Sequence, residues 1–106
     1  MALSLSSRRV ADAVTVSAQG EVDLPTADDL EREIAAAVGS DATAILVDLG
    51  GVTFLDSAGI NVLLKGRRLA DQHGKSYRVA GAQGMVRQLL RMTGVWEHLS
   101  TPPAGG

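Results

Sequence analysis

The sequence predicts a single α/β domain with a small mixed sheet of about four to five strands and helices packed mainly on one face. Two patterns lead to this prediction. Two alternating segments near the N-terminus predict a hairpin, and helical and strand-like segments then alternate, giving the order ββαβαβα. The length of 106 residues fits one domain with one core. Each strand–helix–strand unit implies a right-handed crossover between parallel neighbours.

The predicted hairpin occupies the first part of the chain. Leucine and serine alternate at the start of residues 3–10, which predicts an edge strand, and a turn at residues 12–13 leads into a second strand at residues 14–18. The sequence Gly-Glu-Val-Asp at residues 20–23 then breaks the alternation. We interpret it as an acidic loop before a helix, either solvated or functional.

The first helix is predicted from residue 26 to Gly39. Thr26 is the expected N-cap, and Asp28 and Asp29 are expected in the first turn, where the helix dipole favours negative charge. Apolar residues recur at helical spacing behind them and leave charged residues on the other side. This amphipathic helix is expected to lie on the sheet.

The central strand is predicted at residues 44–49, where a nearly continuous aliphatic run indicates a strand covered on both faces. Gly50-Gly51 is expected to release the chain, and a second apolar run, residues 52–55, leads to Asp-Ser-Ala-Gly at residues 56–59. A second helix follows from Ser57 to His73. Gly66 in its interior indicates a close packing contact, because glycine costs roughly 1 kcal/mol against alanine there.

The C-terminal part predicts a strand at residues 75–80 and a third helix that begins after a turn at residues 81–84 and ends at Thr93-Gly94. Residues 95–99 are ambiguous between a short strand and a turn. The domain is assigned to residues 1–100, and the Pro/Gly-rich residues 101–106 are expected to be a flexible tail.

Composition excludes several classes of protein. The absence of cysteine excludes disulfides and thiolate metal sites, and neither a signal peptide nor a run of about 20 apolar residues is present. We therefore expect a cytoplasmic protein that does not insert into a membrane. Residues 1–56 carry ten acidic and three basic side chains, whereas residues 57–106 carry seven basic and two acidic ones. This asymmetry favours a polar protein partner over nucleic acid.

Ser57 is the main candidate for chemistry. It fails as a hydrolytic nucleophile, because the elbow motif needs glycine two residues before the serine and Leu55 stands there. His73 and His98 have no spacing that ties them to Ser57 or to a metal, and no phosphate-binding glycine loop is present. No catalytic residue, metal or cofactor is therefore expected, and the chain is not expected to be an enzyme.

Two interpretations of Ser57 remain. A serine at a helix N-terminus can accept a phosphate, which the free N–H groups and the dipole stabilise there. Alternatively, Asp56 or Ser57 only caps the helix. From the residues alone, the capping interpretation is favoured.

The chain resembles the STAS domain family, and within it the bacterial anti-sigma factor antagonists. The motifs that carry the resemblance span nearly the whole chain in order: Gly20-Glu21-Val22-Asp23, Thr26-Ala27, Ile45-Leu46-Val47-Asp48-Leu49, Phe54-Leu55-Asp56-Ser57-Ala58-Gly59 and Met92-Thr93-Gly94-Val95. This resemblance reverses the preference at Ser57.

In that family the serine that matches Ser57 is phosphorylated by its partner, an anti-sigma factor that is also a serine kinase. The resemblance implies that the unphosphorylated chain binds the anti-sigma factor and releases the sigma factor, that phosphorylation of Ser57 ends binding, and that a PP2C-type phosphatase restores it. ATP and Mg²⁺ would belong to the kinase. The implied partner-binding residues are Glu21, Asp23, Thr26, Asp56, Ser57, Ala58, Gly59 and Asn61.

The chain departs from the family at two places. Many relatives have a second serine where this chain has Ala58, and many have a further C-terminal helix where this chain has residues 101–106.

The main alternative function is a STAS subunit of a lipid-transport or stressosome-like assembly, which would act as a protein-binding scaffold. Direct binding of a nucleotide by this domain is a third possible function, and only a binding measurement can provide support for it.

Overall fold

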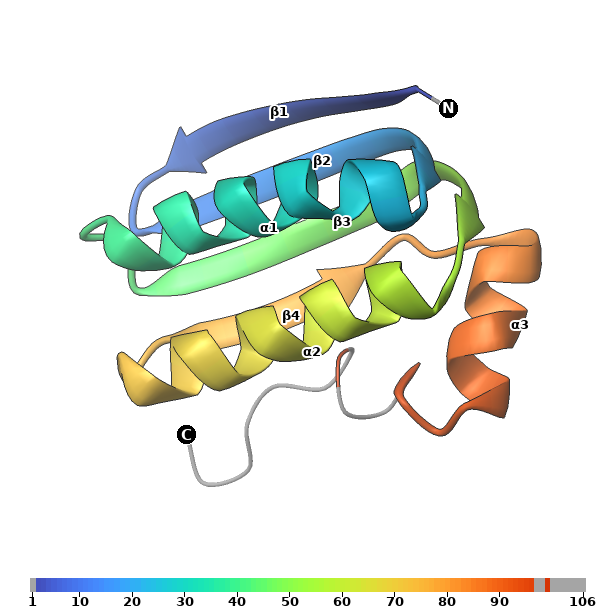
Figure 1. Cartoon of the computed structure of the whole chain (residues 1–106). Helices are drawn as coiled ribbons and strands as arrows, with labels where there is room; N and C mark the ends of the chain where they lie inside the picture. The colour runs from blue at the N-terminus through green and yellow to red at the C-terminus, as the bar shows by residue number, and fades with distance from the viewer. Residues whose placement is uncertain (1, 97–98, 100–106) are drawn as a thin grey trace.

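The computed structural model describes residues 2–96 and 99, and over these it contains one four-stranded sheet and, up to residue 92, three helices (Figure 1). The elements are β1 (Leu3–Val10), β2 (Ala13–Val22), α1 (Leu24–Gly39), β3 (Ala44–Leu55), α2 (Ser57–Gln72), β4 (Ser76–Ala80) and α3 (Gly84–Met92). The strand order is β1-β2-β3-β4; β1 is antiparallel to β2, and β2, β3 and β4 are parallel. The predicted fold class and element order are confirmed.

The core lies between the sheet and the two long helices. Val16, Val47 and Val79 pair across β2, β3 and β4 and are fully buried. Helices α1 and α2 run side by side over this row in Figure 1. On the other face of β3, Leu46 and Asp48 are only half-buried, so the prediction of a strand covered on both faces is wrong for the described residues. Both long helices cover the same face, which leaves the second face of the sheet polar.

Strand β3 continues through Gly50 and Gly51 to Leu55, where the sequence predicted an interruption. At two places β3 contains one residue more than the part of β2 that it pairs with. The first lies between the pairs Ser17–Asp48 and Gln19–Gly51, and the second lies between the pairs Gly20–Val52 and Glu21–Phe54. Each irregularity is a bulge that adds a residue to one strand. Buried residues in this part of β3 are therefore three apart, and the two residues between them are exposed. Hydropathy alternation alone does not show such a strand.

Residues 20–23 also differ from the prediction of a loop. Gly20, Glu21 and Val22 belong to β2, because they pair with the bulged part of β3. Asp23, not Thr26, is the N-cap of α1, and Thr26 lies three residues inside the helix. The structure therefore places Asp28 and Asp29 beyond the first turn, which holds no acidic residue.

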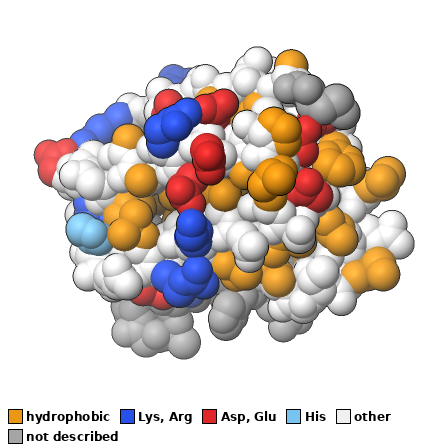
Figure 2. Space-filling view, viewed as in Figure 1, with side chains coloured by type: hydrophobic (Ala, Val, Ile, Leu, Met, Phe, Trp, Pro, Cys, Tyr) orange, Lys and Arg blue, Asp and Glu red, His pale blue; other side chains and the backbone are white. Residues whose placement is uncertain are grey.

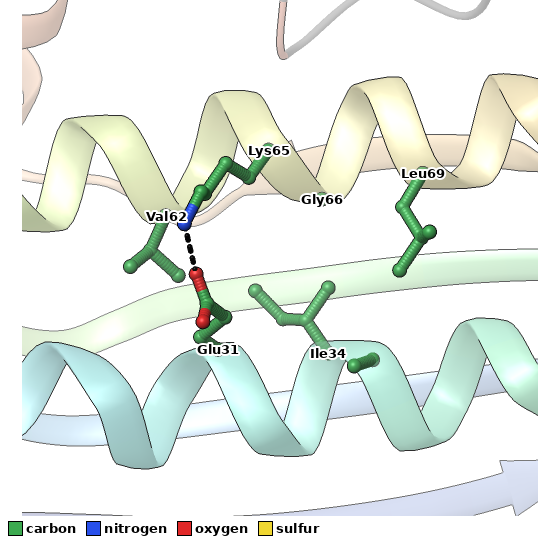
Figure 3. A pocket seen from close by; sticks show the side chains of 7 residues that line it. Glu31, Ile34, Val62, Lys65, Gly66 and Leu69 are labelled. Atoms are coloured by element: carbon green, nitrogen blue, oxygen red, sulfur yellow. Dashed lines mark hydrogen bonds and ion pairs between the residues drawn. The ribbon is translucent and has the colours of Figure 1, made fainter.

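Helix α2 packs closely on α1 and β4 at Gly66. A Cβ atom on Gly66 would lie 2.7 Å from the Tyr77 hydroxyl and 2.8 Å from Cγ2 of Ile34, so the predicted close contact is confirmed. A groove of about 300 Å³ lies between the two helices, and an ion pair of 2.8 Å joins Glu31 and Lys65. Figure 3 shows these two side chains pointing toward each other across the groove. This groove is thus bridged by the protein's own side chains.

The segment after α3 is not a strand in its described part. Trp96 and Leu99 are helical, and the Leu99 N–H donates to the Val95 carbonyl at 3.2 Å. Leu99 is fully buried. The expected tail at residues 101–106 lies outside the described residues. Of the helices that are described, none combines the length and hydropathy needed to span a membrane.

Candidate functional site

The candidate site lies at the edge of the sheet where the parallel strands β2 and β3 end. Val22 of β2 pairs with Leu55 of β3, and each is followed directly by an aspartate that begins a helix. Asp23 and Asp56 have nearly the same backbone conformation, with φ and ψ of −122° and −176° in one and −116° and −169° in the other. The register of the sheet therefore places two helix N-termini next to each other.

At the start of α2, Asp56 is the cap. Its Oδ1 accepts hydrogen bonds from the N–H of Ala58 at 2.9 Å and from that of Gly59 at 3.3 Å. Ser57 follows as the first helical residue and is exposed, and its hydroxyl makes no hydrogen bond to any residue that the structure describes. Capping at this helix is thus supplied by Asp56 alone, and the Ser57 hydroxyl remains available to solvent.

At the start of α1, the cap is reciprocal. The Thr26 N–H donates to Asp23 Oδ1 at 3.2 Å, and the Asp23 N–H donates to Thr26 Oγ1 at 3.0 Å, which is a capping box. The Thr26 hydroxyl also lies 2.9 Å from the carbonyl oxygen of Glu21, so it ties the end of β2 to the helix. One carboxylate oxygen of Glu21 is buried and has no partner among the described residues.

The remaining predicted site residues lie on the first two turns of α2. Asn61 is exposed and lies four residues after Ser57, on the same side of the helix. Ala58 is half-buried against the core. Gly59 is buried, and a Cβ atom there would clash with Leu55 and lie 2.9 Å from Cγ1 of Val22. Gly59 and the buried Thr26 can therefore influence a partner only through the geometry that they impose.

Carboxylates and exposed apolar side chains lie on the elements that meet at this edge of the sheet. Glu21, Asp23 and Asp56 lie on the strand ends and caps next to it. Leu24 directly follows Asp23 and is 76% exposed, and Phe54 is 40% exposed. Figure 2 shows hydrophobic side chains gathered at the end of the molecule where α3 and the start of α2 lie. Sequence reasoning missed this exposed apolar surface, because it placed Phe54 in the apolar run of residues 52–55 and gave Leu24 no role in binding.

The arrangement has no metal-binding character in the described part of the chain, where no three His, Asp or Glu residues lie close enough together to hold an ion. What it offers is an exposed hydroxyl on the first turn of a helix, at an edge of the sheet that also carries acidic and apolar groups. These features define a small α/β domain with an exposed serine hydroxyl at the edge of the sheet where two helices begin.

The chain belongs to the STAS domain family. The family model described as "Mlab, STAS domain" matches residues 5–100, which is nearly the whole sequence. The predicted family is thus confirmed from a comparison that is independent of the motifs chosen above.

The chain is similar to characterised anti-sigma factor antagonists in sequence and in structure. The chain is 32% identical over 80 residues to the anti-sigma-F factor antagonist RsfB of Mycobacterium tuberculosis; the match covers 76% of this chain and 65% of RsfB, so the chain spans somewhat under two thirds of that relative. It is also similar to the crystal structure of an anti-sigma factor antagonist from Mycobacterium paratuberculosis, with 27% identity, a TM-score of 0.83, and coverage of 92% of this chain and 83% of the other.

The same fold occurs in SpoIIAA of Bacillus, which has been solved in an unphosphorylated and a phosphorylated form. The unphosphorylated form has a TM-score of 0.68 at 18% identity and covers 84% of this chain and 83% of SpoIIAA. The phosphorylated form has a TM-score of 0.66 at 20% identity and covers 88% and 87%. At these identities the likeness shows the shared fold.

Proposed function

We propose that this chain is an anti-sigma factor antagonist that phosphorylation of Ser57 switches off. The unphosphorylated form binds an anti-sigma factor that is also a serine kinase, and this binding releases the sigma factor in the cytoplasm. A PP2C-type phosphatase removes the phosphate and restores binding. The observation that carries the proposal is the exposed Ser57 hydroxyl beside a cap that does not need it. The similarity to RsfB and to the paratuberculosis antagonist supports the choice of partner.

In the proposed reaction this chain is the substrate. The Ser57 oxygen attacks the γ-phosphorus of ATP bound to the kinase, the new O–P bond forms, the bond to the bridging oxygen of ADP breaks, and the hydroxyl proton passes to a base of the kinase. ATP and Mg²⁺ are held by the kinase. The chain contributes the position of its hydroxyl, which the first turn of α2 holds at the surface.

The phosphate changes the charge of the binding surface. It adds about 1.5 to 2 negative charges at pH 7. The N–H groups of Ala58 and Gly59, which would otherwise bind a phosphate, are already occupied by the carboxylate of Asp56. We therefore expect the phosphate to point outward, next to the carboxylates of Asp23 and Asp56. A partner that fits the neutral hydroxyl would then meet a bulky dianion.

Capture of partners from the cells of origin, with the full chain as bait and intact-mass analysis of the bait, tests the proposal. The captured kinase, purified and supplied with ATP and Mg²⁺, is expected to add one phosphate to the chain. Ser57→Ala is expected to accept none, whereas Ser76→Ala, which changes another exposed serine, is expected to accept one. Full phosphorylation of Ser57→Ala would contradict the switch. Capture of transport-complex subunits, with Ser57 unmodified, would support the scaffold function instead.

A further inference from the structure

Strand β1 presents an open edge in the part of the chain that the structure describes. It has eight residues and lies at one end of the sheet, and no described element lies beyond it (Figure 1). Strand β4, at the opposite end, has only five residues. An edge strand carries a row of N–H and C=O groups that can pair with a further strand. The edge of β1 is therefore the longer of the two places where a strand could be added.

The pairing with β2 shows which backbone groups of β1 point outward. The register of β1 on β2 is unbroken from Leu3 to Val10. The Glu21 N–H donates to the Ala2 carbonyl at 3.1 Å, so Ala2 and every second residue after it form hydrogen bonds with β2. The N–H and C=O groups of the residues between them point away from the sheet. These residues are Leu3, Leu5, Ser7 and Arg9.

Strand β1 lacks most of the features that prevent pairing between sheet edges. It contains no proline and no bulge, and it is longer than the usual strand of about 5–6 residues. Leu3 and Leu5 pack against the core but are only half-buried, because no strand covers their outer side. The charges of β1 are confined to one end, at Arg8 and Arg9. Pairing is therefore disfavoured only where these arginines would meet other basic groups.

An antiparallel pair of two β1 strands uses every outward backbone group when Ser6 lies opposite Ser6. Each outward residue of one copy then faces an outward residue of the other. The facing pairs are Leu3 with Arg9 and Leu5 with Ser7. Each such pair exchanges two hydrogen bonds, which gives about eight hydrogen bonds between the two copies. Moving the register by two residues in either direction leaves some of these groups unpaired.

The same register separates the charges. Arg8 lies opposite Ser4 of the second copy, so no two arginines face each other, and Arg9 is already paired with Asp41 of its own chain. A register centred on Arg8 would instead place like charges opposite each other. On the helix side, the two Leu5 residues lie diagonally across the pair, about 7–8 Å apart and within reach of each other. Strand β1 thus provides neutral residues opposite its own basic end, which makes a second copy a suitable partner.

The arrangement of the helices leaves room for a second copy. Helix α1 lies mainly over β2 and α2 mainly over β4 (Figure 1). In the joined sheet the two β2 strands are three strand spacings apart, about 14 Å. Packed helices need only about 8–10 Å, so α1 does not collide with its counterpart. Ser57, at the start of α2, lies away from the edge of β1 and stays exposed in both copies.

We propose that the outer edge of β1 binds β1 of a second copy of this chain, in the antiparallel register centred on Ser6, so that two four-stranded sheets join into one. The dimer is weak, because contact along one strand edge buries much less surface than the roughly 1,600 Å² of a standard interface. It goes beyond the proposed function and does not depend on it, since neither Ser57 hydroxyl is covered.

The first test measures self-association of the full chain by sedimentation equilibrium from about 10 µM to 1 mM. A monomer–dimer equilibrium is expected. As the dimer forms, amide hydrogen exchange is expected to slow most at Leu5 and Ser7, whose N–H groups point outward, and much less at Ser6, whose N–H group β2 already holds. A chain that stays monomeric over this range, or a dimer that slows exchange at neither Leu5 nor Ser7, would overturn the proposal.

A proline at an outward position tests the edge directly. Ser7→Pro removes an N–H group that points away from β2, so the pairing of β1 with β2 is kept while two hydrogen bonds of the dimer are lost. The dissociation constant is expected to rise about tenfold or more. Ser7→Ala is the matched control: it loses the 2.9 Å hydrogen bond from the hydroxyl to Glu33 but keeps the N–H group, and should dimerise as before. Dimerisation that survives Ser7→Pro would show that another surface is used.

Two substitutions at Ser4 test the register without changing the backbone. Ser4 is exposed, and Ser4→Glu places a carboxylate opposite Arg8 of the second copy, whereas Ser4→Arg places a like charge there. Because the dimer contains each pair twice, Ser4→Glu is expected to tighten it about threefold or more and Ser4→Arg to weaken it to a similar extent. In Arg8→Glu the two effects are expected to exchange. Equal effects of the two substitutions would contradict the register, and with it the proposal.

Discussion

Helices α1 and α2 begin at the same edge of the sheet, in the same way, and differ in one respect. Both follow a parallel strand and both are capped by an aspartate with extended backbone. At α1 the hydroxyl of Thr26 closes a capping box and is buried, whereas at α2 the hydroxyl of Ser57 is exposed and does not contribute to the cap. The Thr26 hydroxyl therefore stabilises the start of its helix, whereas the Ser57 hydroxyl is exposed to solvent.

The difference explains how a residue that we propose to be regulatory can lie at a structurally important point. A helix start needs partners for its first N–H groups, and Asp56 provides them. Because the fold does not depend on Ser57, a modification there can change binding without unfolding the domain. The same modification at Thr26 would have to open a hydrogen-bonded, buried site.

The largest effect is expected at Ser57 itself. Ser57→Asp places a carboxylate where the phosphate would be, next to Asp56, and should weaken binding of the anti-sigma factor roughly 100-fold, since like-charge contacts cost several kcal/mol. Isothermal titration with the purified partner measures this. Ser57→Asn, of similar shape and without charge, is the control and should lose much less. Equal losses in the two variants would show that shape, not charge, controls binding.

A substitution at Gly59 should lower the free energy of unfolding, because it disturbs the packing of the first turn of α2 on the sheet. Gly59→Ala brings a methyl group against Leu55 and Val22, and overpacking of this kind costs about 1–3 kcal/mol. Urea unfolding followed by circular dichroism gives the loss. Gly39→Ala is the matched control, because no atom lies within 4 Å of its added Cβ and it should be neutral or slightly stabilising. Similar losses in both variants would exclude the packing explanation.

The two hydroxyls should differ in their contribution to stability. Thr26→Ala removes one half of the capping box and the contact with the Glu21 carbonyl, and should lower the free energy of unfolding by about 1 kcal/mol. Ser57→Ala should change it by less than about 0.5 kcal/mol, as expected for an exposed side chain without partners. A larger loss at Ser57 than at Thr26 in thermal unfolding would reverse the comparison.

The last effect appears only at alkaline pH and concerns the core that supports both helices. Burial raises the pKa of Tyr77, whose hydroxyl donates to the Leu63 carbonyl at 2.9 Å. The folded chain keeps this phenol neutral while the unfolded chain ionises it near pH 10, so its contribution to stability is complete below that pH and is lost as the pH rises. Between pH 10 and 11, Tyr77 should account for a loss approaching 1.4 kcal/mol per pH unit. Tyr77→Phe should lack this component in a series of melting curves, and an identical pH dependence in both proteins would rule it out.

Sequence patterns predicted the elements that depend on local rules. The hairpin and the three helices follow from periodicity and turn chemistry. The path of β3 through Gly50-Gly51 could not be predicted, because its bulges are stabilised by pairing with β2, which is distant in sequence. The cap at Asp23 was missed for a similar reason: both Asp23 and Thr26 are good caps, and only the end of β2 at Val22 decides between them.

The candidate site was predicted in its parts and not in its arrangement. Ser57 could be singled out from sequence and family resemblance, and whether it caps the helix could not be decided until the bonds of Asp56 were seen. The role of the site residues in partner binding stays a prediction. The exposure of Phe54 and Met92 had no signal in the sequence, because a bulge and the packing of α3 produce it.

The two bulges of β3 have a consequence for how the sequence can vary. Leu49, Val52 and Leu55 reach the core in phase only because two extra residues are present, and Asp56 then falls beside Asp23. Deleting one residue between Leu49 and Asp56 would turn Leu55 away from the core and move the second helix start out of line. In related proteins, exposed side chains of this stretch such as Thr53 can therefore vary, whereas its length should be kept, so insertions and deletions should be absent there.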